Sequence, residues 1–330
     1  MGRQTGLALV LVLWVISLLT IMAGSFALTM RRETAVVEGL STIAQAQAIA
    51  ESGLAMAEMM LLNPDANKRW RTDGSVYEVA SATAKVRIRL FSEMGKIDIN
   101  HANQALLQSL LSQAPIVGET KINLVNAILD WRDDDEDARP DSAELPEYKN
   151  AGLSYGPRNK AFQSIEELQL VLGMDKEVFL WLEPLVTVYS AQAEVSLEVA
   201  PEEVLQVLPD LDAKRIETYV AARLESARNN QPIPPFPASA ADSISVADES
   251  SGQLADDTSL GGMYTLVVEA RLADESRAII SAVVEAADGA DITPFKLLKW
   301  QQITANEASL FTDAMSDLLV KQYAQPEFDN

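Results

Sequence analysis

An uncharged run of 24 residues, from Leu7 to Met30, constrains the fold of this chain more than any other feature. A secretory signal peptide has an apolar region of only ~7–15 residues, followed by small residues at a cleavage site. This run is longer, and no clean Ala-x-Ala site follows it. A helix of this length extends ~36 Å, enough to cross the ~30 Å hydrocarbon core of a bilayer. We therefore expect one transmembrane helix that the protein keeps.

The helical pattern continues beyond the membrane run to about Leu62, because the chain is rich in Ala, Gln and Glu and has no proline before Pro64. Basic residues flank the apolar run on both sides, so the positive-inside rule assigns no orientation. An apolar stripe at three- and four-residue spacing predicts that the end of this helix is half-buried in a soluble domain. The stripe consists of Ile43, Ala46, Ala50, Leu54, Ala57 and Leu61.

Strand signals lie before and after a helical region. Apolar and basic side chains alternate over residues 85–91, as in a strand with one solvated face. Residues 264–272, 277–287 and 295–303 are three further strand candidates, preceded by a loop rich in Pro, Ser and Asp. The pattern predicts an α+β fold in which these four strands form an antiparallel sheet packed on the long helix. Apolar residues at helical spacing in residues 304–323 predict a helical tail.

The region between the strands is helical and contains a repeat. The segment "DINHANQALLQSL", which starts at Asp98, resembles "SLEVAPEEVLQVL", which starts at Ser196. Each copy predicts a short extended stretch followed by a helix start, and Pro201 suits the first helical turn. Further helices are predicted at about residues 121–131, 165–172 and 176–182. Residues 95–211 therefore form a helical insertion within the sheet-forming part of the chain.

An acidic segment of this insertion has the spacing of calcium ligands. Five carboxylates fall at positions 1, 3, 5, 9 and 12 of an EF-hand loop, and Arg139 could offer its carbonyl at position 7. Ala138 stands where the sharp turn needs Gly, and Pro140 is unusual there. A solvated acidic loop is the more common explanation of such a segment, so the spacing alone does not establish a calcium site. The five carboxylates belong to Asp133, Asp135, Asp137, Asp141 and Glu144.

Composition excludes several function classes. The formal net charge of −22 argues against nucleic acid and against a basic lipid-binding surface. The chain has no cysteine, which removes disulfides, thiol catalysis and cysteine zinc sites. Its single histidine, His101, suits a surface or capping role, and no catalytic triad or phosphate-binding glycine loop can be assembled. We therefore do not expect an enzyme.

The insertion and its surroundings resemble the K-type minor pseudopilin of type II secretion (general secretion pathway protein K). The resemblance covers a short basic leader ending in Gly6, the apolar helix, the insertion and the segment "LLKWQQ" at residues 297–302. Three positions depart from the family. Ser142 stands where Gly is common, Leu145 where an acid is common, and Glu198 where Asn is common. The matching positions are Asp130, Trp131, Asp133, Asp135, Ala143, Glu144, Tyr148, Asn159, Glu166, Glu167, Leu168, Gly173 and Met174.

The resemblance implies a type IV pilin-like fold: a long N-terminal transmembrane helix packed on a small antiparallel sheet, with a large all-α domain inserted after the first strand. It implies a subunit at the tip of a pseudopilus that helps export folded proteins across the outer membrane. The implied partners are minor pseudopilins of the I and J types, the major pseudopilin, the inner-membrane assembly platform and the prepilin peptidase. It also implies calcium in the insertion, bound in an irregular loop by Asp133, Asp135, Asp137, Asp141 and Glu144.

The resemblance gives roles to residues of the first helix. The prepilin peptidase would cleave between Gly6 and Leu7, and Leu7 would be N-methylated. Most pilin-like subunits carry Glu at the fifth mature position, where this chain has Leu11, and the absence of that charge suits a subunit with nothing above it. The upper part of the alanine-rich stripe packs either on the sheet of this chain or on other pilin helices. The expected partner-binding residues are Leu11, Ile43, Ala46, Ala50 and Leu54.

The expected organisation is a bacterial inner-membrane protein with one span and most of its chain in the periplasm. Two alternatives remain open: a minor pilin at the tip of a type IV pilus, and a membrane-anchored periplasmic calcium- or substrate-binding module outside any filament. The expected segments are the leader (1–6), the transmembrane part of the helix (7–30), the rest of that helix with the first strand (31–94), the inserted domain (95–211), the remaining pilin-like part (212–303) and the tail (304–330).

Overall fold

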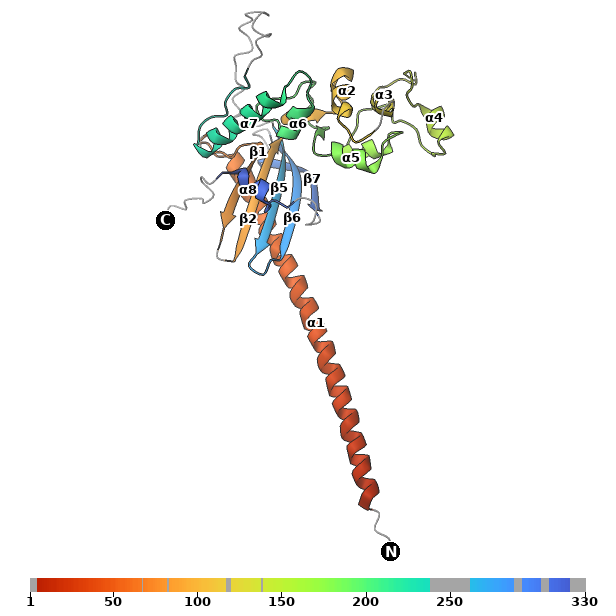
Figure 1. Ribbon diagram of the computed structural model, residues 1–330, viewed down its shortest axis with the longest axis vertical. Helices are drawn as coiled ribbons and strands as arrows, with labels where there is room; N and C mark the ends of the chain where they lie inside the picture. The colour runs from red at the N-terminus through yellow and green to blue at the C-terminus, as the bar shows by residue number, and fades with distance from the viewer. Residues whose placement is uncertain are drawn as a thin grey trace, which may run out of the picture.

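The computed structural model describes residues 5–66, 68–81, 83–116, 120–137, 139–237, 262–287, 293–303 and 309–320. Its first element is one continuous helix of 57 residues, α1 (Thr5–Leu61). Most of α1 projects away from a head that contains the other helices and strands (Figure 1). The prediction of a single helix longer than 50 residues is therefore confirmed.

A six-stranded sheet lies at the base of the head, in the order β7-β6-β5-β2-β1-β8. Neighbouring strands are antiparallel, except that β8 runs parallel to β1. The four predicted strands are present as β2, β5, β6 and β7, which confirms the predicted fold class. The strands are β1 (Asp73–Ala80), β2 (Ala84–Ser92), β5 (Met263–Leu272), β6 (Arg277–Ala286), β7 (Phe295–Ile303) and β8 (Leu319–Val320).

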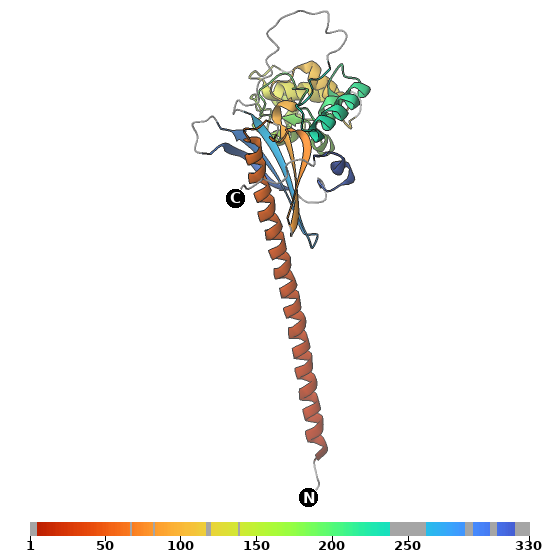
Figure 2. The same ribbon diagram turned by 90° about the vertical axis from the view of Figure 1, so that its left-hand side faces the viewer.

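The last turns of α1 cover one face of this sheet (Figure 2). Ala46, Ala50 and Ala57 are fully buried and share a hydrophobic cluster with Ile88 and other residues of β2, β5 and β6. The alternation predicted for β2 is present, since its apolar side chains face α1. Small side chains on α1 allow close approach of the helix to the sheet. That approach buries the apolar face of a sheet that would otherwise be exposed to water.

Gly53 marks a close contact between α1 and the sheet. A Cβ atom there would lie 2.7 Å from Cγ1 of Val268 and 2.8 Å from Cγ1 of Val86. We expect Gly53→Val to lower the free energy of unfolding by ~1–3 kcal/mol, because a well-packed core tolerates added methyl groups poorly. Gly39→Val is the matched control, since a Cβ there meets nothing within 4 Å. Urea unfolding measures both variants, and equal stability of the two would contradict the packing argument.

The chain between β2 and β5 forms a helical unit, defined here as residues 93–228, with a core of its own. The predicted helices at 121–131 and 176–182 are α3 and α5, and residues 165–170 form a 3-10 helix, η2. The elements are η1 (Glu93–Gly95), β3 (Ile97–Asp98), α2 (Gln104–Ser112), α3 (Thr120–Arg132), α4 (Leu145–Asn150), η2 (Ile165–Leu170), α5 (Lys176–Leu182), β4 (Val186–Thr187), α6 (Glu202–Val207) and α7 (Ala213–Arg228).

The predicted repeat corresponds to two equivalent helix starts, at α2 and α6. The side chain of Asn103 caps α2 by accepting a hydrogen bond from the backbone N–H of Leu106 at 2.8 Å. Pro201 is the N-cap residue of α6. The His101 side chain is half exposed and its Nδ1 lies 3.1 Å from Asp98 Oδ1, consistent with the surface role expected for it.

Three details of the predicted architecture are wrong. The insertion follows the second strand rather than the first, because β1 precedes β2. The inserted unit is not all-α, since β3 and β4 pair as a short parallel sheet. Its core also extends past the predicted end at residue 211, because Ile216 and Tyr219 of α7 belong to it.

The segment 309–320 crosses the face of the sheet opposite α1. Glu269 of β5 is fully buried there and accepts hydrogen bonds from the Ser309 hydroxyl and the Leu310 backbone N–H. A continuous helix over residues 304–323 is the wrong prediction for this segment. Only α8 (Asp313–Asp317) is helical, and β8 then joins β1; residues 304–308 and 321–323 lie outside the described residues.

Candidate functional site

One helix in the described part of the chain is long and apolar enough to cross a membrane, and it spans Leu9–Leu61. Its apolar side chains near the amino terminus are exposed: Leu11 is 60% exposed and Trp14 76%. Such a surface is unfavourable in water and suits a lipid environment, where a helix also satisfies its own backbone hydrogen bonds. Gly6 and Leu7, the predicted processing site, lie in the first turn of α1.

Between the apolar run and the sheet, α1 passes through a neck, defined here as residues 31–45. Val36, Leu40 and Ile43 are 50–63% exposed on the neck. At 100° per residue they lie on one face of the helix, and this face continues toward the half-buried Leu54. Nothing in the described part of the chain covers this apolar face.

The partner-binding role predicted for Ala46 and Ala50 is wrong. Both side chains are fully buried against the sheet of their own chain, so no partner can reach them. The accessible members of the predicted set are Leu11 and Ile43, with Leu54 partly covered. A partner that binds the soluble part of α1 would therefore contact the neck.

The acidic segment follows α3 and is organised around Asp130, whose side chain is fully buried. The Arg139 backbone N–H donates to Asp130 Oδ2 at 3.1 Å, and the Ser142 hydroxyl donates to the same oxygen at 2.5 Å. The Arg139 guanidinium donates to the carboxylates of both Asp130 and Asp133. One cation of the chain itself thus holds two carboxylates of this loop.

Three buried oxygens around this loop have no hydrogen-bond partner: Asp133 Oδ1, Glu144 Oε1 and Asn159 Oδ1. Burial, and then the charges of Asp130, Asp133 and Asp135, raise the pKa of Glu144 to about 7. Desolvation also raises the pKa of the Asp133 carboxyl. Buried acceptors without donors are costly, and the Arg139 guanidinium does not reach these three. A hard cation, which prefers oxygen ligands, fits this set chemically.

The structure does not gather the five predicted calcium ligands into one EF-hand site. Asp135, Asp137 and Asp141 are exposed, and Asp141 has a left-handed backbone with φ of 57°. Across the described residues, no three His, Cys, Asp or Glu side chains are already arranged around one metal position. Of the predicted ligands, only Asp133 and Glu144 contribute buried, unpartnered oxygens.

Two residues of the site, Asp130 and Asn159, were not predicted as ligands, although both are positions of the family resemblance. Asn159 has φ of 51°, and its side-chain Nδ2 donates to the Asp135 carbonyl at 2.6 Å. This bond ties the acidic loop to the segment before η2. The Nδ2 atom of Asn159 thus holds the loop, while its Oδ1 atom is a buried acceptor without a hydrogen-bond partner.

A cluster of aromatic side chains lies next to the acidic loop. Trp131 stacks on Phe162 with 5.9 Å between the ring centroids and lies 6.2 Å from Tyr148. The Tyr148 hydroxyl accepts a hydrogen bond from the Leu172 backbone N–H at 2.9 Å, and Asn100 bonds both backbone groups of Phe162. The loop is therefore attached to rigid core residues at both ends.

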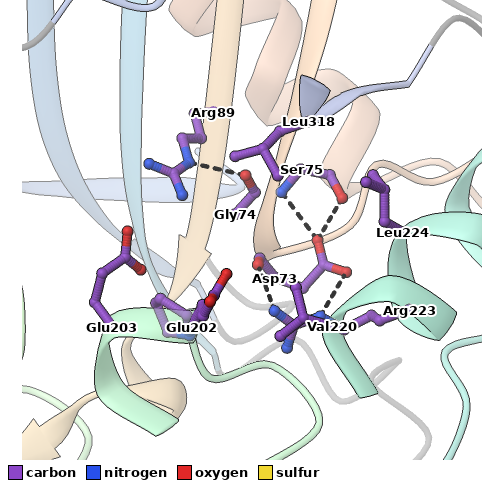
Figure 3. A pocket seen from close by; sticks show the side chains of 11 residues that line it. Asp73, Gly74, Ser75, Arg89, Glu202, Glu203, Val220, Arg223, Leu224 and Leu318 are labelled. Carbon is purple, nitrogen blue, oxygen red and sulfur yellow. Dashed lines mark hydrogen bonds and ion pairs between the residues drawn. The ribbon is translucent and has the colours of Figure 1, made fainter. Parts of the chain in front are cut away.

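A pocket lies where the sheet meets the helical unit (Figure 3). Gly74 and Arg89 line it from the sheet, and Glu202, Glu203 and Arg223 line it from the helical unit. Arg89 Nε donates to the Gly74 carbonyl at 2.8 Å. Burial lowers the pKa of Arg89, while Glu203 and Asp73 act in the opposite direction. The pocket thus lies in a polar joint between two parts of the head.

Comparison with known proteins finds a similarity for part of the chain. Residues 80–191 match the family model described as type II secretion system (T2SS), protein K. A similar solved structure is the crystal structure of the GspK-GspI-GspJ complex from the enterotoxigenic Escherichia coli type 2 secretion system, with 14% sequence identity, 83% of this chain and 99% of that chain covered, and a TM-score of 0.49. No curated protein matches the chain. Residues 80–191 of this chain are thus similar to the protein K family of the type II secretion system.

Proposed function

We propose that this protein is a minor pseudopilin at the tip of the type II secretion pseudopilus, where it initiates or caps assembly. The observation that supports this role most directly is the combination of two features. Residues 80–191 match protein K, and the sheet to which they connect packs on the end of a 57-residue helix. A helix of this length can sit in a membrane at one end and position a bulky head at the other. The proposed location is the bacterial inner membrane, with one span and the head in the periplasm.

The proposed partners are minor pseudopilins of the I and J types, followed by the major pseudopilin. The exposed neck face formed by Val36, Leu40 and Ile43 supports a helix-to-helix contact with such partners. The inner-membrane assembly platform and the prepilin peptidase would act on the same helix before assembly. The side chains of α1 from Leu9 to Ser41 are exposed, which leaves this part of the helix free for such contacts.

Charges on the neck are expected to disrupt this contact. Leu40→Asp combined with Ile43→Asp should reduce co-purification of the I and J type partners by about tenfold or more, since 1.4 kcal/mol already gives that factor. Gln45→Asp is the matched control, because Gln45 is exposed on the opposite face of the neck. Pull-down from membranes measures the effect. Normal recovery of both partners by the double variant, or equal loss with the control, would rule out this face and favour a module outside the filament.

Processing is a second test of the assignment to pilin-like proteins. In cells with a prepilin peptidase, the precursor should lose residues 1–6 and begin at an N-methylated Leu7. Gly6→Val should block cleavage, because a side chain at this position prevents close approach of the backbone to the peptidase. Intact-mass measurement distinguishes the two forms, with Gly24→Val, at an open position further along α1, as the control. Retention of Met1 in unmodified protein from such cells would contradict the proposal.

We also propose that the acidic loop binds calcium. Asp133, Glu144 and Asn159 would hold the ion through the three oxygens that lack partners, with Asp130 held beside them by Arg139 and Ser142. The ion would neutralise carboxylates that otherwise repel one another and would stabilise the loop between α3 and η2. Asp135, Asp137 and Asp141 are exposed and would contribute only if the loop rearranged around the ion.

A further inference from the structure

The head has two hydrophobic cores. One belongs to the helical unit, and the other lies between α1 and the sheet, where Ala227 near the end of α7 also contributes. The seam between them is polar and contains buried charged side chains, with Asp73, Glu93 and Arg223 each at most 5% exposed. The pocket beside Arg89 and Glu203 opens onto the same seam, so apolar packing does not fill it. Ala227 alone is too small an apolar contact to fix the angle between the two parts, so the polar contacts of the seam must contribute.

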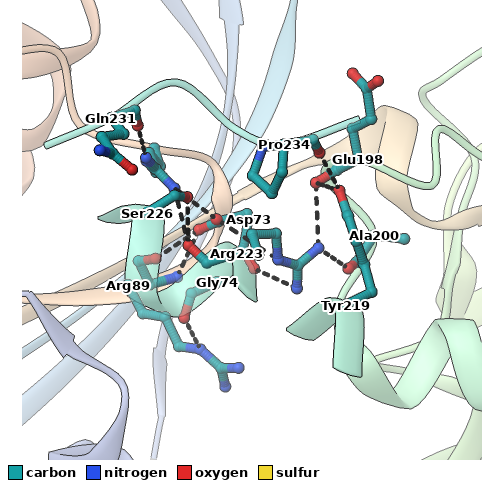
Figure 4. A network of polar contacts seen from close by, with 12 residues as sticks. Asp73, Gly74, Arg89, Glu198, Ala200, Tyr219, Arg223, Ser226, Gln231 and Pro234 are labelled. Carbon is teal, nitrogen blue, oxygen red and sulfur yellow. Dashed lines mark hydrogen bonds and ion pairs between the residues drawn. The ribbon is translucent and has the colours of Figure 1, made fainter. Parts of the chain in front are cut away.

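Arg223 of α7 forms the first connection across the seam (Figure 4). Its Nη1 donates to the carbonyls of Glu198 at 3.1 Å and Ala200 at 2.7 Å, which belong to the helical unit. Its Nε lies 3.7 Å from the carboxylate of Asp73, and its Nη2 contacts the Asp73 carbonyl at 3.5 Å. One buried guanidinium therefore contacts the first residue of β1 and two carbonyls before α6.

Arg71 strengthens this connection from the side of the sheet. Its Nη1 donates to the Arg223 carbonyl at 3.1 Å and to the Ser226 hydroxyl at 2.9 Å, and its Nη2 donates to the Gln231 carbonyl. Asp73 is in turn fixed by Ser75, whose backbone N–H and hydroxyl donate to Asp73 Oδ1 at 3.0 and 2.7 Å. The group formed by Arg71, Asp73 and Arg223 is called the arginine clamp below.

Glu93 forms a second connection, the glutamate clamp, at the end of β2. Its carboxylate accepts hydrogen bonds from the hydroxyl of Thr187 in β4 and from the hydroxyl of Thr265 in β5. Lys96 Nζ lies 2.7 Å from the same carboxylate and 3.1 Å from the Thr265 hydroxyl. A buried carboxylate thus joins a strand of the helical unit directly to a strand of the main sheet.

We propose that these two clamps hold the helical unit at one fixed angle on the sheet, so that the head moves as a single rigid body. Hydrophobic contact is not directional, whereas hydrogen bonds weaken steeply when their angles change. A small rotation of the unit would break bonds at both clamps together and leave buried charges without partners, which is costly. Axial movement of α1 would then be transmitted to the helical unit without bending at the seam. The inference depends on the seam alone and does not require the proposed function.

The test measures the distance between the two parts in the full chain in detergent. The chain has no cysteine, so Lys176→Cys in α5 and Ala273→Cys in the turn after β5 provide two unique spin-label positions, both exposed. Electron paramagnetic resonance should give a single narrow distance peak for the otherwise unmodified protein. Arg223→Met combined with Glu93→Gln should lose that peak and give a broad distribution. Lys214→Met with Glu217→Gln, at exposed positions of α7, should keep it.

Two results would overturn the proposal. One is a broad distance distribution in the protein with intact clamps, which needs no clamp variant and therefore does not depend on how the variants fold. The other is a single narrow peak in the clamp variant at the original distance. Arg223→Lys serves as a milder variant, since it keeps the charge but cannot reach both sets of carbonyls, and it should broaden the peak less than Arg223→Met.

Discussion

Chelating calcium is expected to lower the melting temperature of the full chain. A ligand that binds only the folded state at a hundredfold excess over its Kd stabilises by ~2.7 kcal/mol. For a head of this size, that corresponds to a fall of about 5–10 °C. The physical reason is local: Asp133 Oδ1, Glu144 Oε1 and Asn159 Oδ1 are buried acceptors with no donor, and mutual repulsion contributes to the raised pKa of Glu144. Differential scanning calorimetry with calcium and with chelator measures the difference.

Substitutions in the loop should separate bound calcium from general charge effects. Asp133→Ala combined with Glu144→Ala should abolish the difference between calcium and chelator, because it removes two of the three free oxygens. Asp137→Ala is the matched control, since it removes an exposed carboxylate of the same loop and should leave the difference nearly unchanged. Identical melting curves with calcium and chelator would show that the loop is a solvated acidic segment. If the double variant still melted at a higher temperature with calcium than with chelator, the ion would have to bind elsewhere in the chain.

The strands that the sequence predicts share one property, a regular alternation or a long apolar run. Strand β1 lacks both, since its sequence "DGSVYEVA" begins with an acid and Gly74, which adopts φ of 87°. Its pairing with β2 is also irregular between Asp73 and Val76. The hairpin with β2 and the arginine clamp hold β1 in place, and neither leaves a periodic pattern in the sequence. The short strand β8 was missed for the same reason, because only its contact with β1 defines it.

The position of the acidic loop could be predicted, but its geometry could not. EF-hand spacing predicts all five carboxylates as ligands alike. In the structure Asp135, Asp137 and Asp141 are exposed, whereas Asp133 and Glu144 contribute buried oxygens. The difference arises because Arg139 turns its guanidinium onto Asp130 and Asp133 instead of offering only its carbonyl. A side chain that folds back in this way depends on the buried position of Asp130 at the end of α3. Sequence spacing contains no information about that burial.

The stripe on α1 shows a second limit of periodicity. Spacing identifies the face of the helix that must be covered, but it does not say what covers it. Ala46 and Ala50 lie under the sheet of their own chain, whereas Ile43, on the same stripe, is half exposed on the neck. The boundary depends on where the sheet ends, which is a property of the folded head. Only the structure could therefore divide the stripe into a core part and an accessible part.

Isolated pseudopili are expected to contain one copy of this chain, located at one end. The helical unit adds residues 93–228 at the end of the sheet that lies away from the projecting part of α1 (Figure 1). This bulk would have to be accommodated around every subunit of a closely packed shaft. A rigid connection to the sheet would prevent the helical unit from rotating away from neighbouring subunits. If the chain is cleaved after Gly6 as proposed, Leu11 takes the place at which the resemblance to pilin-like subunits leads us to expect a Glu that pairs with a neighbouring amino terminus. Both features are compatible with the top position, where no subunit lies above.

Quantitative mass spectrometry of pseudopili measures the copy number, and gold labelling of the head locates it. Leu11→Glu should leave the copy number at one, because it restores the charge without removing the bulk of the helical unit. Its folding should also be unchanged, since Leu11 is exposed near the start of α1, whereas the helix packs on the sheet only from Ala46 onward. If Leu11→Glu instead distributed the protein along the shaft, the missing charge and not the head would decide its position. Many copies of the unmodified chain along the shaft would contradict the tip assignment itself, because a subunit with this head would then fit between neighbours.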